Sequence, residues 1–299
     1  MSESANGILI LYKSAGMTSQ SAVSRVRRLF DGVKAGHTGT LDPMATGVLP
    51  ILLGRAVKAS EYMLESGKHY RATLRLGITT DTEDTTGSVL STSDAIPDEA
   101  RVRSALDAFR GEILQTPPMY SALKVGGRKL VDLARAGEVI ERTPRRITVY
   151  ALRAERVSDT DYTLDVHCSK GTYIRTLCAD IGQALGCGGA MASLERTEAA
   201  GFPLSSAHTL QELEALDPAA RAALLYPTEH IFCDLERITL PAFFAHLARN
   251  GVEIYLHKLG CSLPLGTRVR LHDNNGFFAL GEVRAFDGGN AIKPIKQFG

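Results

Sequence analysis

The chain has few cysteines: five in 299 residues, scattered along the sequence and never arranged as a C-x-x-C pair. This spacing argues against a disulfide framework and against a structural zinc site, because both need cysteines at characteristic separations. The eight histidines are equally dispersed, and the H-E-x-x-H motif of zinc hydrolases does not occur. We therefore expect a protein that keeps its thiols reduced and works without a bound metal.

Long apolar runs are also lacking. No run reaches the roughly 20 apolar residues that cross a membrane, and the short polar segment Met1–Gly7 has no signal-peptide anatomy. We expect a cytoplasmic protein that does not contact a membrane. The net charge is only +1, so the overall composition does not indicate a nucleic-acid-binding protein. Any such function must rest on local basic patches.

The sequence does contain a regular succession of strand and helix patterns. Hydrophobic residues make up 44% of the chain and charged residues 22%, which is ordinary for a globular protein with a core. Strands are predicted over 7–12, 48–53, 69–77 and 161–168, and helices over about 19–30, 97–110 and 174–185. From about residue 236, short strand-like pieces between glycine-rich turns predict a small β-rich domain.

One stretch, residues 36–50 (GHTGTLDPMATGVLP), combines three glycines, two prolines, one histidine and one aspartate. Glycine and proline at this density predict a shaped loop, because glycine allows unusual backbone angles and proline fixes one. The apolar run Val48–Leu53 follows as a buried strand, so the loop can hold one side chain, Asp42, rigidly. The alternative is that Asp42 only caps its own turn, which is ordinary chemistry for an Asp-Pro pair.

Three further residues allow both a structural and a functional interpretation. Lys13 follows the first strand and could be a solvated surface lysine. Tyr70 lies on the apolar face of the strand 69–77 and could be a core tyrosine. Arg175 lies in the first turn of a helix, where a cation opposes the helix dipole. Such local conflicts mark functional sites more often than others, although a surface ion pair also explains this one.

The most basic region of the chain is the stretch from Pro117 to about Arg146. Seven cations stand there against three acidic residues: Lys124, Arg128, Lys129, Arg135, Arg142, Arg145 and Arg146 against Asp132, Glu138 and Glu141. Phosphate binding needs such a patch, but a solvated surface loop has the same composition.

A second polar stretch, Thr79–Gly87, is acidic. It is superficially similar to the D-x-D-x-T motif of phosphate-transferring hydrolases. The similarity fails at the second acid, which would be Glu83, and no apolar strand leads directly into Asp81. A magnesium-dependent phosphotransferase built around Asp81 is therefore only an alternative interpretation. We interpret the stretch as a turn-rich connection.

The sequence GHTGTLDPMATGVLPILLG closely resembles the GHTGxLDPxAxGxLP signature of the B-type tRNA pseudouridine synthases. Other stretches are similar to further motifs of that family, although Ser14 replaces the usual proline of the first: KSAGMT at 13–18, KHYRA at 68–72, TDTEDTTG at 80–87, PPMYSALK at 117–124, KGTYIR at 170–175 and GGAMASLERT at 188–197. The similarity covers the first two-thirds of the chain. The terminal FFALGEVRAFDGGNAIKPIKQF also resembles the last strands of PUA-type RNA-binding modules.

The resemblance implies roles for individual residues. Asp42 would be the catalytic residue and Arg175 its charge partner. Tyr70 would stack on the target base and take the C5 proton, Tyr173 would pack against that base, and Leu194 would line its pocket. Lys13 would support the loop, and His37 would fill the stack that the flipped base leaves. Contacts to the RNA backbone would come from five cations: Lys124, Arg128, Lys129, Arg145 and Arg146.

The resemblance also implies a fold and an activity. The expected fold is α+β, with a central, mainly antiparallel mixed sheet flanked by helices in a catalytic domain over 1–235. That domain would carry a basic mobile insertion over about 117–146, and a PUA-like domain would follow over 236–299. The expected activity converts uridine to pseudouridine at position 55, in the T-loop of tRNA, on a flipped-out base and without a cofactor.

Three points stay open from the residues. Asp42 could attack C1′ or C6, or the route could pass through a glycal. The family suggests a monomer with tRNA as its partner and no obligate protein partner. A function from another class, a tRNA-binding folding factor whose catalysis is secondary, is the alternative. An Asp42→Asn variant would separate the two.

Overall fold

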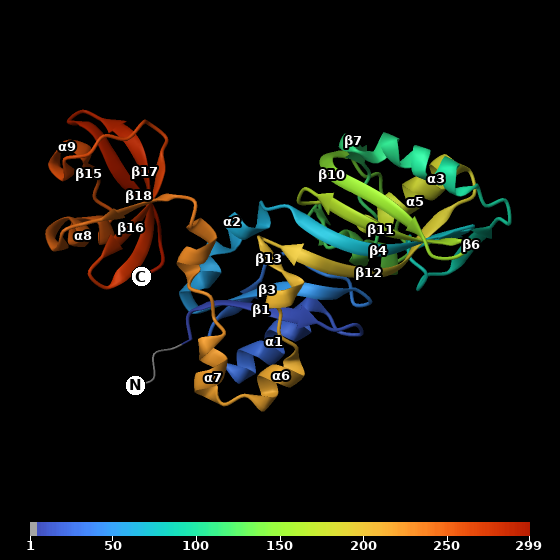
Figure 1. Cartoon of the computed structure of the whole chain (residues 1–299), viewed down its shortest axis with the longest axis horizontal. Coiled ribbons are helices and arrows are strands. Elements are labelled where there is room, and N and C mark those ends of the chain that lie inside the picture. The colour runs from blue at the N-terminus through green and yellow to red at the C-terminus, as the bar shows by residue number, and fades with distance from the viewer. Residues whose placement is uncertain (1–4) are drawn as a thin grey trace.

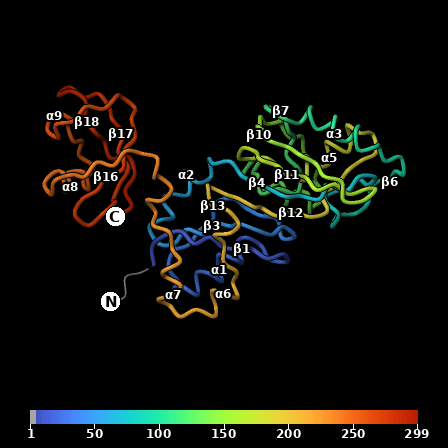
Figure 2. The backbone as a smooth tube through the Cα atoms, in the orientation of Figure 1, coloured from blue at the N-terminus to red at the C-terminus, as the bar shows by residue number. Residues whose placement is uncertain are grey.

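The computed structural model describes residues 5–299, and its first strand begins at Gly7 (Figure 1). The first four residues of the segment Met1–Gly7 lie outside the described part. A large mixed sheet with its helices forms one body, and the C-terminal residues form a second body with a sheet of their own. Figure 2 shows this second body, in orange to red, gathered apart from the rest of the chain.

The large sheet is mainly antiparallel, as predicted. Its seven main strands lie in the order β1-β3-β12-β4-β11-β10-β7, with β2 beside β3 and β13 beside β12. The pair β3–β12 is parallel, and the other pairs described in this sheet are antiparallel. The bounds are β1 Gly7–Lys13, β2 Ala35–His37, β3 Thr46–Leu53, β4 Lys68–Leu76, β7 Gly111–Gln115, β10 Arg145–Arg156, β11 Asp161–Cys168, β12 Gly189–Ala199 and β13 Phe202–Pro203.

Alternation along the strands decides which side chains face the core. In β4, Tyr70, Ala72 and Leu74 are buried and face inward, whereas Arg71 and Arg75 between them are exposed. The predicted alternation is therefore confirmed. The strand begins one residue before the prediction, which places Lys68 on the inward face.

Helices cover the sheet at the predicted places. The helix α1 (Ser19–Leu29) begins where the Thr18 side chain accepts a hydrogen bond from the backbone N–H of Ser21. The helix α5 (Ile174–Leu185) packs against β12 and ends at Gly186, whose φ of 80° suits a residue without a side chain. The predicted helix 97–110 is α3 (Glu99–Ala105), continued by a 3-10 turn (Leu106–Phe109).

The remaining short elements connect these parts. They are the 3-10 helices Gly54–Ala59, Leu204–Ser206 and Thr228–Phe232, the helices α2 (Ser60–Leu64), α6 (Leu210–Ala215) and α7 (Pro218–Ala223), and the hairpin β5 (Ile78–Thr80) with β6 (Val89–Thr92). The acidic stretch Thr79–Gly87 forms most of the turn of that hairpin, as predicted. No helix of residues 5–299 has the length and apolar composition to cross a membrane.

The basic stretch forms a small substructure of its own. It contains the hairpin of β8 (Lys124–Val125) and β9 (Arg128–Lys129) and the helix α4 (Leu130–Arg135). Arg145 and Arg146 were expected in the same insertion, but they belong to β10 and pair with β7 in the large sheet. The substructure is therefore shorter than predicted, because the sheet takes up its last two cations.

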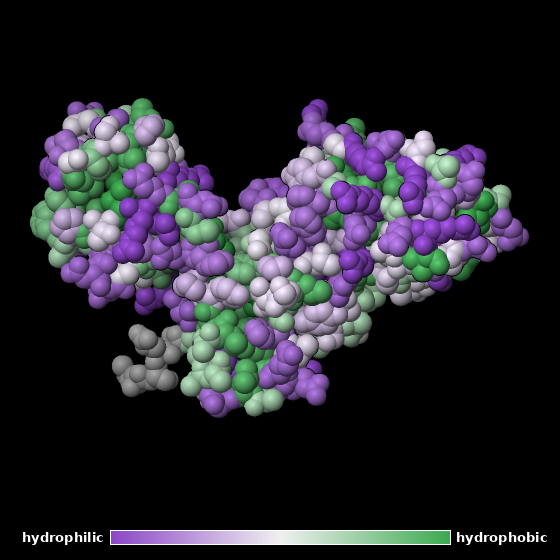
Figure 3. All heavy atoms as spheres, viewed as in Figure 1, coloured by the Kyte–Doolittle hydropathy of each residue, from purple (hydrophilic) through white to green (hydrophobic). Residues whose placement is uncertain are grey.

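The C-terminal body is β-rich, as predicted, and also carries two helices that the sequence did not indicate. Its sheet has the order β14-β16-β17-β18-β15, and buried apolar residues between Leu240 and Ile292 form a separate core. The bounds are β14 Glu236–Thr239, α8 Ala242–Arg249, β15 Ile254–Tyr255, α9 Leu256–Leu259, β16 Arg268–Asp273, β17 Gly276–Phe286 and β18 Gly289–Gln297. In Figure 3 this body and the lobe carrying β10 stand on either side of a broad hollow with largely hydrophilic walls.

Candidate active site

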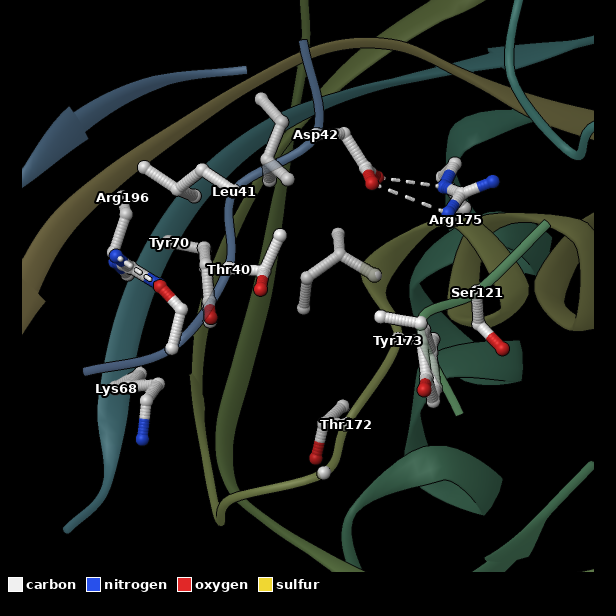
Figure 4. A pocket seen from close by; sticks show the side chains of 15 residues that line it. Thr40, Leu41, Asp42, Lys68, Tyr70, Ser121, Thr172, Tyr173, Arg175 and Arg196 are labelled. Atoms are coloured by element: carbon white, nitrogen blue, oxygen red, sulfur yellow. Dashed lines mark hydrogen bonds and ion pairs between the residues drawn. The ribbon is translucent and has the colours of Figure 1, made fainter. Parts of the chain in front are cut away.

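A cavity of about 270 Å³ lies where the loop after β2 meets the inward faces of β4 and β12 (Figure 4). The loop before α5 and the segment before β8 close its other side. Fifteen residues line it: Gly39, Thr40, Leu41, Asp42, Lys68, Tyr70, Ser121, Ala122, Gly171, Thr172, Tyr173, Ile174, Arg175, Leu194 and Arg196. Five of the predicted site residues are among them, namely Asp42, Tyr70, Tyr173, Arg175 and Leu194.

The loop that carries Asp42 is fixed on both sides of this residue. On one side, the Leu41 N–H donates to the Ser19 hydroxyl oxygen at 2.9 Å, and that hydroxyl donates to the Leu41 carbonyl at 3.1 Å. On the other side, the fully buried Lys13 ammonium donates to the carbonyl oxygens of Ala45 at 2.6 Å and of Pro43 at 3.3 Å. The Asp-Pro turn is thus anchored to α1 and β1, and Lys13 is no solvated surface lysine.

Asp42 forms a two-point ion pair with Arg175. The Arg175 Nε lies 2.8 Å from Oδ2 of Asp42, and Nη2 lies 3.4 Å from Oδ1. The Arg175 side chain is 6% exposed, whereas that of Asp42 is 36% exposed. The cation is therefore buried behind the carboxylate, and the carboxylate stays open to the cavity. This arrangement suits an aspartate that must reach a reacting atom.

Arg175 also joins two other segments to the site. Its Nη1 donates to the Thr82 carbonyl at 3.1 Å, and its Nη2 donates to the Tyr120 carbonyl at 2.7 Å. Asp84 lies further away, with Oδ2 at 3.9 Å from the Arg175 Nε. The acidic hairpin turn and the segment before β8 are thereby held to the same guanidinium as the loop that carries Asp42.

Tyrosines stand on two sides of the cavity. Figure 4 shows Tyr70 on one side and Tyr173 on the other. Tyr70 is buried on β4, and this burial raises the pKa of its phenol, while the nearby Arg196 acts in the opposite direction. The backbone of Tyr173 is clamped by the buried Gln115, whose amide accepts from the Tyr173 N–H at 2.8 Å and donates to its carbonyl at 3.0 Å.

The structure places His37 beside the cavity and outside its lining. His37 pairs with Ile51 at the edge of β3, and its Nδ1 is buried without a hydrogen-bond partner among the described residues. Burial lowers the pKa of His37, and the charge of Arg196 lowers it further. A role for His37 toward the RNA stays a prediction.

The five cations expected at the RNA backbone lie on two parts of the chain, the β8–β9 hairpin and β10. Lys124, Arg128 and Lys129 are exposed on the β8–β9 hairpin, and Arg128 pairs with Glu138 at 2.9 Å. Arg145 and Arg146 are exposed at the start of β10.

Of the three cations that line the cavity, Lys68 and Arg196 were not predicted from the sequence, whereas Arg175 was. Each lies two residues from a predicted site residue on the same face of its strand, Lys68 beside Tyr70 and Arg196 beside Leu194. The two-residue period could have found them. Gln115 was not predicted either. In residues 5–299, no group of three or more His, Cys, Asp and Glu side chains is arranged to hold a metal ion.

Comparison with known proteins identifies the family. Residues 27–174 match the N-terminal domain of the TruB family pseudouridylate synthases, and residues 175–232 match the C-terminal domain of tRNA pseudouridylate synthase B. The tRNA pseudouridine synthase B of Aromatoleum aromaticum is 43% identical over 97% of this chain and 91% of its own length. This chain belongs to the TruB family. The Chromohalobacter salexigens protein of the same name is 44% identical over 92% of this chain and 89% of its own length.

Solved structures agree on the fold of this TruB-family chain. A chain of a Cbf5-Nop10-Gar1 complex superimposes with a TM-score of 0.72 at 24% identity, over 99% of this chain and 85% of that chain. A chain of an H/ACA RNP bound to a substrate RNA containing 2′-deoxyuridine gives 0.71 at 22% identity, over 99% and 86%. The family resemblance and the fold class predicted from the sequence are confirmed.

Proposed function

We propose that this protein isomerises uridine to pseudouridine in tRNA, and that its target is the uridine at position 55 of the T-loop. The family and the names of its relatives support the tRNA substrate. The observation that carries the chemistry is the ion pair of Asp42 and Arg175 at the edge of a cavity walled by Tyr70 and Tyr173. It offers one open carboxylate beside two aromatic surfaces.

The reaction rearranges bonds within one nucleotide, and no atom other than protons is exchanged with the surroundings. The N1–C1′ bond breaks, the base turns, C5 bonds to C1′, the C5 proton leaves and N1 gains a proton. Asp42 is the nucleophile, because its carboxylate is the group of the cavity that is both fixed and open. A cavity of about 270 Å³ takes a single nucleotide, so the target must leave its stack before it can react.

Tyr70 and Tyr173 hold the flipped base between them, and Leu194 supplies an apolar surface. Tyr70 accepts the C5 proton as the phenolate, the form that the neighbouring Arg196 charge favours against the effect of burial on its pKa. Lys13 supports the loop through the carbonyls of Pro43 and Ala45. Fixing the carboxylate in this way lowers the entropic cost of reaching the reactive geometry. Of the possible routes, attack at C1′ and attack at C6 both need the same open carboxylate.

RNA contacts beyond the cavity come from the exposed cations of the β8–β9 hairpin and of β10. The separate sheet and core of the C-terminal body support a division into a catalytic domain over 1–235 and an RNA-binding domain over 236–299. The second family match ends at residue 232, just before β14 begins. We assign the T-arm of tRNA to these surfaces, His37 to the vacated stack, and a monomer to the working state.

The test is to map pseudouridine on an unmodified tRNA transcript after incubation with the protein. We expect one new pseudouridine, in the T-loop, and none with the Asp42→Asn variant, which should bind the transcript as tightly as the unaltered protein. Modification at a different position would refute the T-loop assignment. Undiminished tritium release from C5-labelled tRNA by Asp42→Asn would refute the role of this residue. If the Asp42→Asn variant still assists the folding of tRNA, that result supports the alternative function as a tRNA-folding factor.

A further inference from the structure

Two further cations, Lys68 and Arg196, line the cavity in addition to Arg175. Lys68 on β4 and Arg196 on β12 are 7% and 1% exposed, and both line the cavity. Arg196 lies directly opposite Tyr70 in the pairing of the two strands, and Lys68 is two residues from Tyr70 on the same face. Figure 4 shows Lys68 and Arg196 on one side of Tyr70 and the pair of Asp42 and Arg175 on the other.

Neither cation has a carboxylate within 4.0 Å among the described residues, in contrast to Arg175. Lys68 Nζ donates to the Ser66 carbonyl at 2.8 Å. Arg196 donates through Nε to the Val48 carbonyl at 2.7 Å and through Nη2 to that of Gly39 at 3.2 Å. Carbonyl dipoles thus compensate part of each charge, but the cavity keeps an unbalanced positive end. Burying two like charges without a counter-ion is costly, and such costs mark functional sites.

The groups around Lys68 act against its charge on balance. Burial is the largest effect, and the neighbouring Arg196 adds to it, so that the pKa of Lys68 falls to about 8. Cys168 and Glu65 favour the protonated lysine, while Lys170 opposes it. An anion bound beside Lys68 would oppose these effects and favour its protonated form.

We propose that Arg196 and Lys68 stabilise the negative charge that develops on the uracil ring during the isomerisation. This inference rests on the proposed function. When Asp42 attacks C1′, or when a glycal forms, the electron pair of the N1–C1′ bond stays on N1, and the free uracil is an anion whose charge O2 and O4 share. When Asp42 attacks C6, the electron pair moves onto C5 and O4. The charge disappears once C5 is bonded to C1′, the C5 proton has left and N1 has taken up a proton.

The depth of the cations favours the base over a phosphate as their ligand. Arg196 is 1% exposed, so a group must enter the cavity to approach it, and in a flipped nucleotide the base enters first. Phosphates stay with the backbone, where exposed lysines are available. Opposite charges stand at the two ends of the cavity. The carboxylate at one end can attack, and the cations at the other end can stabilise the negative charge on the base. Charges fixed before the reaction are the most effective kind.

The test uses neutral and charge-keeping variants of both residues at saturating tRNA. Removing one fixed donor of this kind slows an enzyme about 10²–10³-fold, so we expect Arg196→Gln to lose that much single-turnover rate and Lys68→Gln about tenfold or more. Arg196→Lys keeps the charge but cannot bridge the carbonyls of Val48 and Gly39, so it should recover part of the loss. Lys68→Arg should recover most of the loss, and the Kd for tRNA should change less than threefold. Arg75→Gln, an arginine on the outward face of β4, is the matched control. Thermal unfolding checks that each variant folds.

A tRNA with 5-fluorouridine at the target position separates charge stabilisation from a structural role. Fluorine withdraws electrons and stabilises the uracil anion, so cleavage of the N1–C1′ bond should depend less on Arg196. The fluorinated base has no C5 proton to lose, so the rate compared for both substrates is that of N1–C1′ cleavage. We expect the ratio of unaltered to Arg196→Gln cleavage rates to shrink at least tenfold with this substrate. An equal ratio for both substrates would show a structural role and overturn the proposal. A higher Kd whose salt dependence falls by about one phosphate contact would overturn it in favour of a phosphate site. If the unaltered protein makes no pseudouridine, the proposed function itself fails.

Discussion

Replacing Arg175 by methionine tests the central interaction of the site. The guanidinium holds both oxygens of Asp42 and donates to the carbonyls of Thr82 and Tyr120. Methionine keeps most of the apolar stem of the side chain but none of these contacts. We expect turnover to fall strongly while the Kd for tRNA stays within threefold. The reason is that Arg175 is buried behind the Asp42 carboxylate, which is the more exposed partner of the pair.

The expected magnitude follows from the geometry. Losing one fixed, charged hydrogen-bonding group in an active site costs about 3–4 kcal/mol of transition-state stabilisation, which is about 10²–10³ in rate. Arg175→Lys keeps the charge but cannot bridge two carboxylate oxygens. We therefore expect its turnover rate to lie between those of the unaltered protein and of Arg175→Met. Stability should change less, by about 1–2 kcal/mol, because Asp42 is 36% exposed and water can solvate the carboxylate that loses its partner.

The assay is single-turnover release of tritium from tRNA labelled at C5 of uridine, with the Kd measured by filter binding on the same preparations. Arg25→Met is a suitable control, since Arg25 forms an exposed ion pair with Glu214 at 3.0 Å, outside the cavity lining. An unchanged turnover rate for Arg175→Met would refute the reasoning. So would a loss in Kd as large as the loss in rate, because Arg175 would then act in binding.

Three further predictions concern the surroundings of the site. Turnover at saturating tRNA should fall as the pH rises through about 8, where Lys68 loses its proton, and Lys68→Arg should move this fall to higher pH; an unmoved profile would assign it to another group. Gly47→Ala should lower the free energy of unfolding by roughly 3 kcal/mol, measured by urea denaturation, because φ is +102° and a Cβ would lie 2.3 Å from the Arg196 carbonyl. Replacing Lys124 and Lys129 together by glutamine should weaken tRNA binding and reduce its salt dependence by roughly two phosphate contacts, with saturated turnover unchanged; an unchanged salt dependence would contradict their contact with the backbone.

Local patterns predicted the elements of the fold well. The alternation in β4 and the positions of the helices α1 and α5 each depend on neighbouring residues alone, and each is confirmed. The order of the sheet could not be predicted from such patterns. It places β12 between β3 and β4, and this pairing joins segments more than a hundred residues apart. The family resemblance supplied the fold class where periodicity could not.

Site residues that belong to a distinctive motif were predicted from the sequence. Those that are recognised only by their burial in the folded chain were missed. Asp42 and Arg175 belong to long motifs, so the resemblance brought them together across 133 positions. Lys68 escaped because the predicted strand began one residue too late. Arg196 escaped because an arginine is expected at the surface unless it is paired, and this one is buried against backbone carbonyls.

The loop that carries Asp42 lies close to both missed cations. A Cβ on Gly47 would collide with the Arg196 backbone, whereas at Gly39 the φ of +93° is what favours glycine, since a Cβ there would only reach contact distance of the Arg196 Nη1 (3.4 Å) and the Lys68 Cε (3.5 Å). The loop can lie closely on β12 because Gly47 has no side chain. In this arrangement one loop presents the carboxylate and also covers the cations. Arg196→Gln removes both a charge and the hydrogen bond to the Gly39 carbonyl, so the 5-fluorouridine comparison, which responds to the charge, is the decisive one.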